Sequence, residues 1–138
     1  MIVDQLVCLG RFLPVFATDD THVFTGEEFN GFIMVQADDL NRIEILRAIR
    51  EKRFFASQGP WVQVKLEGNK IRVECSPVSN IRVCSNMCGA MATSGDNMTG
   101  AEFDLEKPSW MPMDLIYYRA EVTDENGKSA WTHPTRIG

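Results

Sequence analysis

The strongest pattern of apolar and polar positions predicts a helix over residues 41–53. Apolar side chains recur in this segment at spacings of three and four, which places them on one face of a helix. Asn41 and Glu44 form a capping-box variant at its start, and the basic residues Arg50 and Arg53 complement the helix dipole at its end.

The chain before this helix carries three shorter patterns. Residues 2–7 have the apolar spacing of a helix, and Gly10 follows at a position that favours a stop. The apolar runs 13–17 and 31–36 predict short strands, the first of the buried kind found in parallel sheets. The run 13–17 leads into the polar residues 18–22. Because α/β folds place their chemistry where buried strands end, these polar residues are the first candidates for a site.

From Trp61 onward the pattern changes to apolar–polar alternation, which is typical of antiparallel strands with one buried face. Two hairpins are predicted, over residues 62–75 and 116–131, each with turn-forming residues at its centre. A further strand is expected to begin at Ile81. Residues 86–107 show little periodicity, and we expect loops there with one or two weak strands.

Composition narrows the class of protein. The 138 residues are 44% hydrophobic and 24% charged, which is typical of a globular domain and excludes a fibre, a disordered tail and a disulfide miniprotein. A formal net charge of −5, without a basic stripe, argues against a nucleic-acid partner. No apolar run approaches the roughly 20 residues of a membrane helix, and no basic signal-peptide start is present. We therefore expect a cytoplasmic protein with no membrane partner.

The cysteines are expected to be reduced in that compartment. Cys84 and Cys88 have a spacing found in zinc sites, but the chain offers no second pair to complete such a site. Cys8 and Cys75 are interpreted as buried free thiols.

Methionines and aromatic residues leave two interpretations open. Five methionines between residues 87 and 113 fit either an adaptable binding surface or irregular core filling, and we favour core filling. The aromatic residues of the tail fit either ordinary strand packing or a carbohydrate-binding platform. Tyr117 is the best candidate for an exposed ring, because its neighbours in register are charged.

Asp20 and His22 are the candidate metal ligands. Carboxylate oxygens and imidazole nitrogens both bind divalent metals, and a spacing of two places both side chains on one face of a strand or lets them converge from a loop. The same residues also fit a polar loop in which Asp20 caps a turn. The residues alone leave both interpretations open.

Several segments together resemble one known family. Residues 15–22 carry a small-Asp-x-His motif after an apolar strand, and a helix then leads to Arg53-Phe54-Phe55-Ala56-Ser57-Gln58-Gly59-Pro60. The tail from Tyr118 through Gly127 to Thr132, followed by a proline, completes the pattern. This arrangement resembles the C-terminal part of the PHP (polymerase and histidinol phosphatase) family, and the resemblance covers nearly the whole chain.

The resemblance implies a metal-dependent phosphoesterase on a distorted (β/α) barrel, with a cluster of divalent zinc, manganese or iron ions. Asp20 and His22 match two of the family's ligands, whereas Asp19 matches a less constant position and receives no role. The family's earlier ligands, which begin with a His-x-His on the first strand, are missing, and His133 is the chain's other histidine. A catalytic metal needs about three protein ligands and an open position. We therefore expect no catalytic residue and no phosphatase activity from this chain alone.

The resulting prediction is an α+β chain in two parts. Residues 1–60 are expected to be the last strand and helix units of a PHP-like barrel, and residues 61–138 a mostly antiparallel, β-sandwich-like tail. The chain would be a C-terminal fragment that meets a phosphoester substrate only when the missing barrel completes it. The alternative is a non-catalytic accessory module for protein or carbohydrate contact. Because a severed barrel leaves open edges, the isolated chain is expected to dimerise, to swap elements or to leave its first 30 residues poorly ordered.

Overall fold

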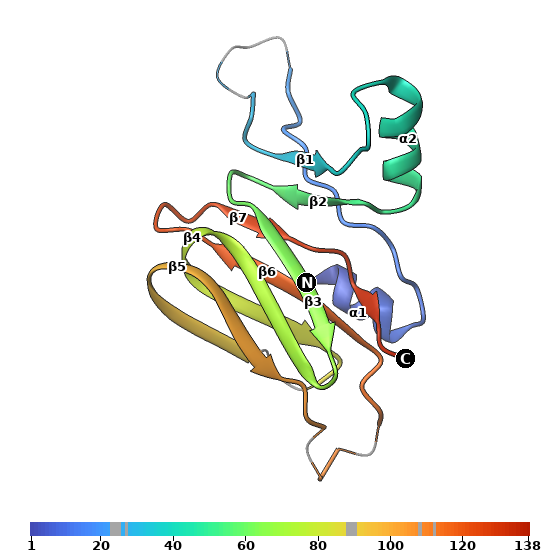
Figure 1. Cartoon of the computed structure of the whole chain (residues 1–138), viewed down its shortest axis with the longest axis vertical. Coiled ribbons are helices and arrows are strands. Elements are labelled where there is room, and N and C mark those ends of the chain that lie inside the picture. Colours follow the sequence, from blue (N-terminus) through green and yellow to red (C-terminus); the bar gives the residue numbers. More distant parts are fainter. Residues whose placement is uncertain (23–25, 27, 88–90, 108, 112) are drawn as a thin grey trace.

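The computed structural model describes residues 1–22, 26, 28–87, 91–107, 109–111 and 113–138. It is a mostly antiparallel β-sheet accompanied by two short helices (Figure 1). The elements in chain order are α1 (Ile2–Cys8), β1 (Phe32–Val35), α2 (Arg42–Arg50), β2 (Phe54–Ser57), β3 (Val62–Glu67), β4 (Lys70–Ser85), β5 (Met91–Asp104), β6 (Tyr117–Thr123), β7 (Ser129–Trp131) and β8 (Thr135–Arg136). The strand order is β1-β2-β7-β6-β4-β3, while β5 pairs with β4 and β8 with β6. Strands from both predicted parts of the chain therefore join one sheet, through the pairing of β2 with β7.

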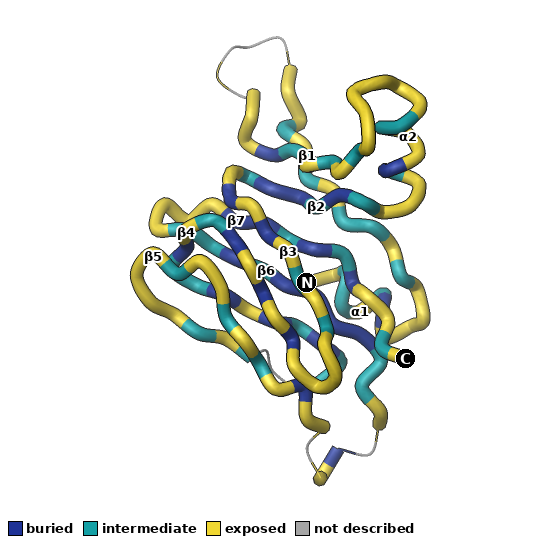
Figure 2. The backbone as a smooth tube through the Cα atoms, viewed as in Figure 1, coloured by how far each residue is buried: buried dark blue, intermediate teal, exposed yellow. Residues whose placement is uncertain are grey.

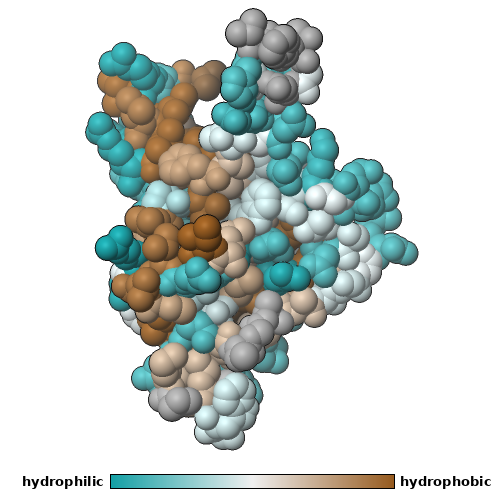
Figure 3. Space-filling model, turned by 180° about the vertical axis from the view of Figure 1, so that it is seen from behind, coloured by the Kyte–Doolittle hydropathy of each residue, from teal (hydrophilic) through white to brown (hydrophobic). Residues whose placement is uncertain are grey.

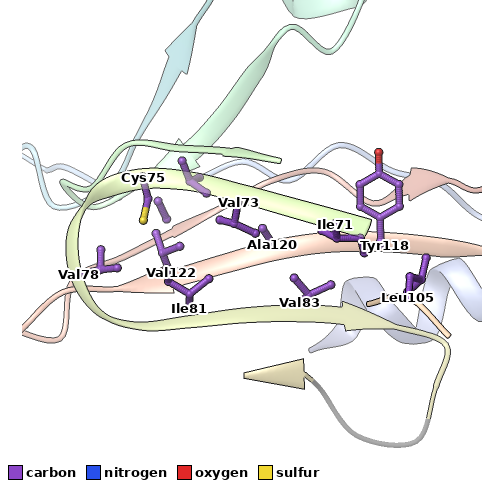
Figure 4. Packing of buried hydrophobic residues seen from close by; sticks show 12 residues of the cluster. Ile71, Val73, Cys75, Val78, Ile81, Val83, Leu105, Tyr118, Ala120 and Val122 are labelled. Atoms are coloured by element: carbon purple, nitrogen blue, oxygen red, sulfur yellow. The ribbon is translucent and has the colours of Figure 1, made fainter. Parts of the chain in front are cut away.

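The long strand β4 organises the fold. Its first half pairs with β3 and with the end of β5, and its second half pairs with β6 and with the start of β5. The register between β4 and β5 shifts between Glu74 and Asn80, around Pro77, which has no N–H to donate to a ladder. Figure 4 shows β4 bending back at this point, so that its two halves enclose a common core.

The core lies inside this bend and is built from alternate residues of the strands. Tyr118, Ala120 and Val122 of β6 face the inward side chains of β4, as the alternation predicted. Figure 2 shows the corresponding buried band along β4 and β6. The buried cluster comprises Val62, Ile71, Val73, Cys75, Val78, Ile81, Val83, Leu105, Tyr118, Ala120, Val122 and Ala130. At roughly 25 cal/mol per Å² of apolar surface removed from water, this burial is the main stabilising contribution.

The local signals for both helices and both hairpins are confirmed. Asn41 caps α2, its side chain accepting a hydrogen bond from the Glu44 backbone N–H at 3.0 Å. Gly10 follows α1 with a φ of +81°, the left-handed conformation that ends many helices. The hairpin turns contain Gly68 and Gly127, which also have positive φ. No described helix is long and apolar enough to cross a membrane.

The strand predicted over residues 13–17 is wrong. This segment is irregular, and Leu13 and Phe16 are about half exposed rather than buried. The segment joins no strand ladder. Instead, the backbone N–H of Val15 donates a hydrogen bond to the side chain of His133. The strand predicted over 31–36 is confirmed as β1.

For residues 86–107, where loops with one or two weak strands were expected, the structure has one long strand, the 14-residue β5. Its sequence carries two glycines and many polar residues, since most of the strand is exposed. Core filling is confirmed for Met87, Met91 and Met98, which pack against the core cluster, whereas Met113 is 59% exposed. Cys88 of the predicted cysteine pair lies outside the described residues.

Two further expectations about exposure are corrected. Cys8 is exposed, whereas Cys75 is buried as predicted. Tyr117 is fully buried instead of presenting an exposed ring. The reason is that α1 contributes Asp4 to the outer side of β6, so both sides of this strand are covered.

An ionic cluster fastens α1 to β6. The guanidinium of Arg119, only 2% exposed, donates two hydrogen bonds of 2.7 Å to the carboxylate of Asp4 and lies 3.2 Å from Glu121. The Tyr117 hydroxyl lies 2.9 Å from the same carboxylate. Burial opposes ionisation of Asp4, but hydrogen bonding and the charge of Arg119 outweigh it and lower the pKa of the carboxyl group. The cluster therefore ties the first helix to a strand more than a hundred residues away in sequence.

Candidate metal-binding loop

The segment that connects Asp19 to Gly31 is here termed the loop, and both predicted metal ligands, Asp20 and His22, lie at its start. Both residues are solvent-exposed. Asp20 has a φ of +53°, a left-handed conformation that aspartate adopts more readily than most residues.

Asp19, which received no predicted role, closes this loop. Its carboxylate accepts hydrogen bonds from the backbone N–H of Gly31 and, at 2.6 Å, from that of Phe29. These bonds, above all the one from Gly31, lower the pKa of the Asp19 carboxyl group. The carboxylate that braces the loop is therefore Asp19, and Asp20 is not needed for that task.

Gly31 brings the two ends of the loop together. A Cβ at this position would lie 2.8 Å from the carbonyl oxygen of Thr18, closer than real Cβ atoms approach backbone oxygens. Only glycine allows the backbone at Thr18 to pack against the start of β1 in this way. The loop carrying Asp20 and His22 is thus fixed at its base by a bracing carboxylate and a close backbone contact.

The segment before the loop, residues 11–18, is here termed the strap. The Nζ of Lys52 donates a hydrogen bond of 3.0 Å to the carbonyl oxygen of Phe12, and the Arg136 guanidinium lies 4.3 Å from the centre of the Phe12 ring. Farther along, the backbone N–H of Val15 donates to Nδ1 of His133 at 2.9 Å. The strap is therefore held by side chains from the α2–β2 connection and from the tail.

The buried surroundings of His133 alter the protonation of its ring. Its ring meets that of Phe54 edge to face at 4.3 Å between centroids, and Phe54 in turn lies 4.7 Å from Phe16 of the strap. Burial, together with the nearby charge of Lys52, lowers the pKa of His133 to about 4. Because Nδ1 accepts a hydrogen bond, the ring is neutral with its proton on Nε2. Sequence reasoning could not find this role, since a lone histidine in a strand-rich tail carries no local signal.

The structure does not bring a complete set of metal-ligating residues together. Across the residues that it describes, no group of three or more His, Cys, Asp or Glu side chains gathers in a position to hold a metal ion. Asp20 and His22 therefore offer one carboxylate and one imidazole. This donor chemistry suits a divalent metal, but a catalytic centre needs about one further protein ligand and an open position.

A second candidate surface is a groove of about 480 Å³ between the β1–β2 hairpin and β3. Trp61, 40% exposed, lies at this groove together with Gln36, Gln63 and Thr135. The backbone of Trp61 is fixed to Ser76 by two hydrogen bonds, one from the Trp61 N–H to the serine hydroxyl at 2.7 Å. The groove thus combines an aromatic ring on a fixed backbone with amide and hydroxyl side chains and the cations Lys52 and Arg53.

Exposed apolar residues concentrate in the first third of the chain. Among the described residues, ten exposed large apolar side chains belong to residues 1–46. They are Met1, Ile2, Leu9, Leu13, Phe16, Phe29, Met34, Leu40, Ile43 and Leu46. Figure 3 shows hydrophobic surface gathered on the side of the molecule that carries α2. Apolar patches of this kind usually mark a surface that another protein segment covers.

Comparisons with family models, with curated proteins and with solved structures find no match for this chain.

Proposed function

We propose that this chain is the C-terminal part of a PHP-type metal-dependent phosphoesterase and supplies Asp20 and His22 to its metal site. The observation that carries the proposal is the loop itself: two residues of suitable chemistry are exposed on a loop whose base is fixed by Asp19 and Gly31. The resemblance of the strap, the loop and the Arg53–Pro60 motif to that family supports the same interpretation. The ligands that complete the site would come from residues outside this chain.

The roles of the two side chains follow from their donor atoms. Asp20 would hold a divalent zinc, manganese or iron ion through a carboxylate oxygen, and His22 would hold it through a ring nitrogen. When bound, such an ion activates water and neutralises charge on the phosphoryl group. Asp19 closes the loop through its hydrogen bonds to Phe29 and Gly31, and Asp20 and His22 are solvent-exposed.

The exposed apolar residues of the first 46 positions also support this proposal. A barrel that contributed the remaining ligands would have to pack beside the loop, and that packing would cover apolar surface around it. The barrel remnant predicted for residues 1–60 stays a proposal. The antiparallel pairing of β1 with β2 departs from the parallel strands of a (β/α) barrel.

Metal titration of the purified chain tests the proposal. We expect Mn²⁺ or Zn²⁺ binding that weakens by at least about tenfold, or roughly 1.4 kcal/mol, in His22→Ala and in Asp20→Ala, as measured by calorimetry. Asp96→Ala is the matched control, because Asp96 is an exposed acid on β5, away from the loop, and its affinity should stay unchanged. No metal binding by the wild-type chain, or equal affinities for all four proteins, would contradict the proposal.

The groove at Trp61 favours a second candidate function, a non-catalytic module that contacts carbohydrate. An aromatic ring beside amide and hydroxyl side chains suits the apolar faces and hydroxyl groups of a sugar, and Lys52 and Arg53 add further hydrogen-bond donors. If this function holds, at least one soluble oligosaccharide should bind, and Trp61→Ala should weaken it by about tenfold or more. Trp110→Ala, which alters a tryptophan that is 70% exposed and not part of the groove, should leave binding intact. Failure of a broad panel of oligosaccharides to bind would remove this candidate.

A further inference from the structure

One imidazole connects three separate parts of the chain. Nδ1 of His133 accepts the hydrogen bond from the Val15 N–H at 2.9 Å, which joins the tail to the strap. The edge-to-face contact of the same ring with Phe54 joins the tail to β2, and Phe54 also meets Phe16 of the strap. The strap at this point is therefore fixed by a side chain 118 positions later in the sequence.

The strap leads directly into the loop. Only four residues lie between Val15 and Asp20, and they include Thr18, which packs against Gly31, and Asp19, which closes the loop. A displacement of the strap at Val15 would therefore shift the very contacts that fix the base of the loop. In the described residues the strap forms no ladder with a strand, so its position depends on these side-chain contacts.

We propose that His133 is a positioning residue, whose neutral imidazole sets the place of the Asp20–His22 loop by holding the strap at Val15. Its link to metal binding rests on the proposed function, whereas its hold on the strap does not. An imidazolium donates from both nitrogens and offers no acceptor, so a protonated ring would face the Val15 N–H with another N–H. Lys52 is the charged group that acts on this ring, and Arg136 lies farther along the same tail, over Phe12. The hold on the strap therefore exists only while His133 is neutral.

Two substitutions separate this role from mere space filling. In His133→Asn, the amide oxygen can occupy the position of Nδ1 and accept the same hydrogen bond, but it does not titrate. In His133→Leu, the side chain remains apolar and of moderate size but has no acceptor. If His133 only fills space, the variant whose side chain packs better should hold the strap better. If His133 acts through its hydrogen bond, the variant that can accept a hydrogen bond should hold the strap better.

Amide hydrogen exchange measured by NMR tests the hold on the strap. At neutral pH we expect the protection of the Val15 and Gly31 amides to fall by about tenfold or more in His133→Leu and to be retained in His133→Asn, while the core amide of Ile81 stays unchanged in both. In the wild type, protection of Val15 should be lost as the pH falls towards about 4. It should persist there in His133→Asn. Equal Val15 protection in the wild type and His133→Leu, or no rescue by asparagine, would overturn the proposal.

The pH dependence of stability gives a second readout with a defined sign. Because the pKa of His133 in the folded chain lies below its ordinary value near 6.5, the unfolded chain binds more protons between that value and about pH 4. His133 thus contributes stability at neutral pH that is lost as the pH falls through this window. His133→Asn should show a smaller loss over the same window, and an identical loss would count against the proposal.

Metal titration at neutral pH distinguishes failure of this proposal from failure of the proposed function. If the wild type binds Mn²⁺, His133→Leu should weaken binding by about fivefold or more, and His133→Asn should restore it. If the wild type binds no metal but Val15 protection follows the expected ranking, the proposed function fails while the hold on the strap stands. If metal binds equally in all three proteins, the link between His133 and the loop is overturned.

Discussion

Replacing Asp4 with alanine is expected to lower the free energy of unfolding by about 3 kcal/mol. The change removes both 2.7 Å hydrogen bonds from the Arg119 guanidinium and leaves that charge buried, with only 2% of the side chain exposed. Loss of one partner from a buried pair is costly because the remaining charge cannot regain water. Glu121, at 3.2 Å from the same guanidinium, still pairs with it in the variant. We therefore expect a loss of stability near the lower end of the range for broken buried ion pairs. Urea denaturation followed by circular dichroism measures the difference.

Asp114→Ala is the matched control for this prediction. Asp114 also pairs with a cation, Lys107, at 2.9 Å, but its side chain is 91% exposed, so its removal should cost less than about 1 kcal/mol. A loss at Asp4 no larger than the loss at Asp114 would show that the Arg119 guanidinium finds water or another partner. It would also show that α1 is not fastened by this cluster.

Replacing Ile81 with alanine is expected to cost about 3 to 4 kcal/mol in the free energy of unfolding. Ile81 is fully buried in the second half of β4, between Thr93 of β5 and Val122 of β6. Removing its larger side chain leaves a cavity that the bent strand cannot close, because both of its neighbours fix the backbone in register. Urea denaturation and thermal unfolding should both record the loss.

The same substitution at Ile43 provides the control. Ile43 lies on the outer side of α2 and is 69% exposed, so Ile43→Ala should change stability by less than about 0.5 kcal/mol. Similar losses at the two positions would contradict the assignment of the core to the inside of the β4 bend. They would instead show that the outward side of α2 is covered in solution, as a homodimer would require.

Local signals predicted the elements that form from nearby residues. Asn41 and Glu44 are three positions apart, and the cap that they form needs no distant partner. The hairpins over β3–β4 and β6–β7 follow from alternation around turns that contain Gly68 and Gly127. These elements could be read directly because pattern and geometry agree within a few residues.

The features that sequence reasoning missed depend on distant partners. Tyr117 and Arg119 alternate with core residues and are therefore expected to be exposed, but α1 brings Asp4 onto their side of β6. The strap resembles a strand in composition, yet it meets the His133 side chain where a strand would need a neighbouring backbone. In β5, polar residues and glycines hide the alternation, since pairing with β4 rather than burial holds the strand.

At the candidate site, too, the sequence indicates residue types but not contacts between distant residues. The sequence singled out Asp20 and His22 by residue type, and the structure leaves both exposed on the loop. It did not identify Asp19 as the brace, because that role requires the backbone N–H groups of Phe29 and Gly31, ten and twelve positions later.

The dependence of the strap on His133 and Arg136 has a consequence for biosynthesis. A ribosome adds about 5 to 20 residues per second, so these partners emerge several seconds after the strap has left the exit tunnel. During that interval Leu13 and Phe16 have no completed tail to meet, and they are open to chaperones or to any other nascent segment that presents an apolar surface. The strap can therefore reach its final position only after the tail has been synthesised.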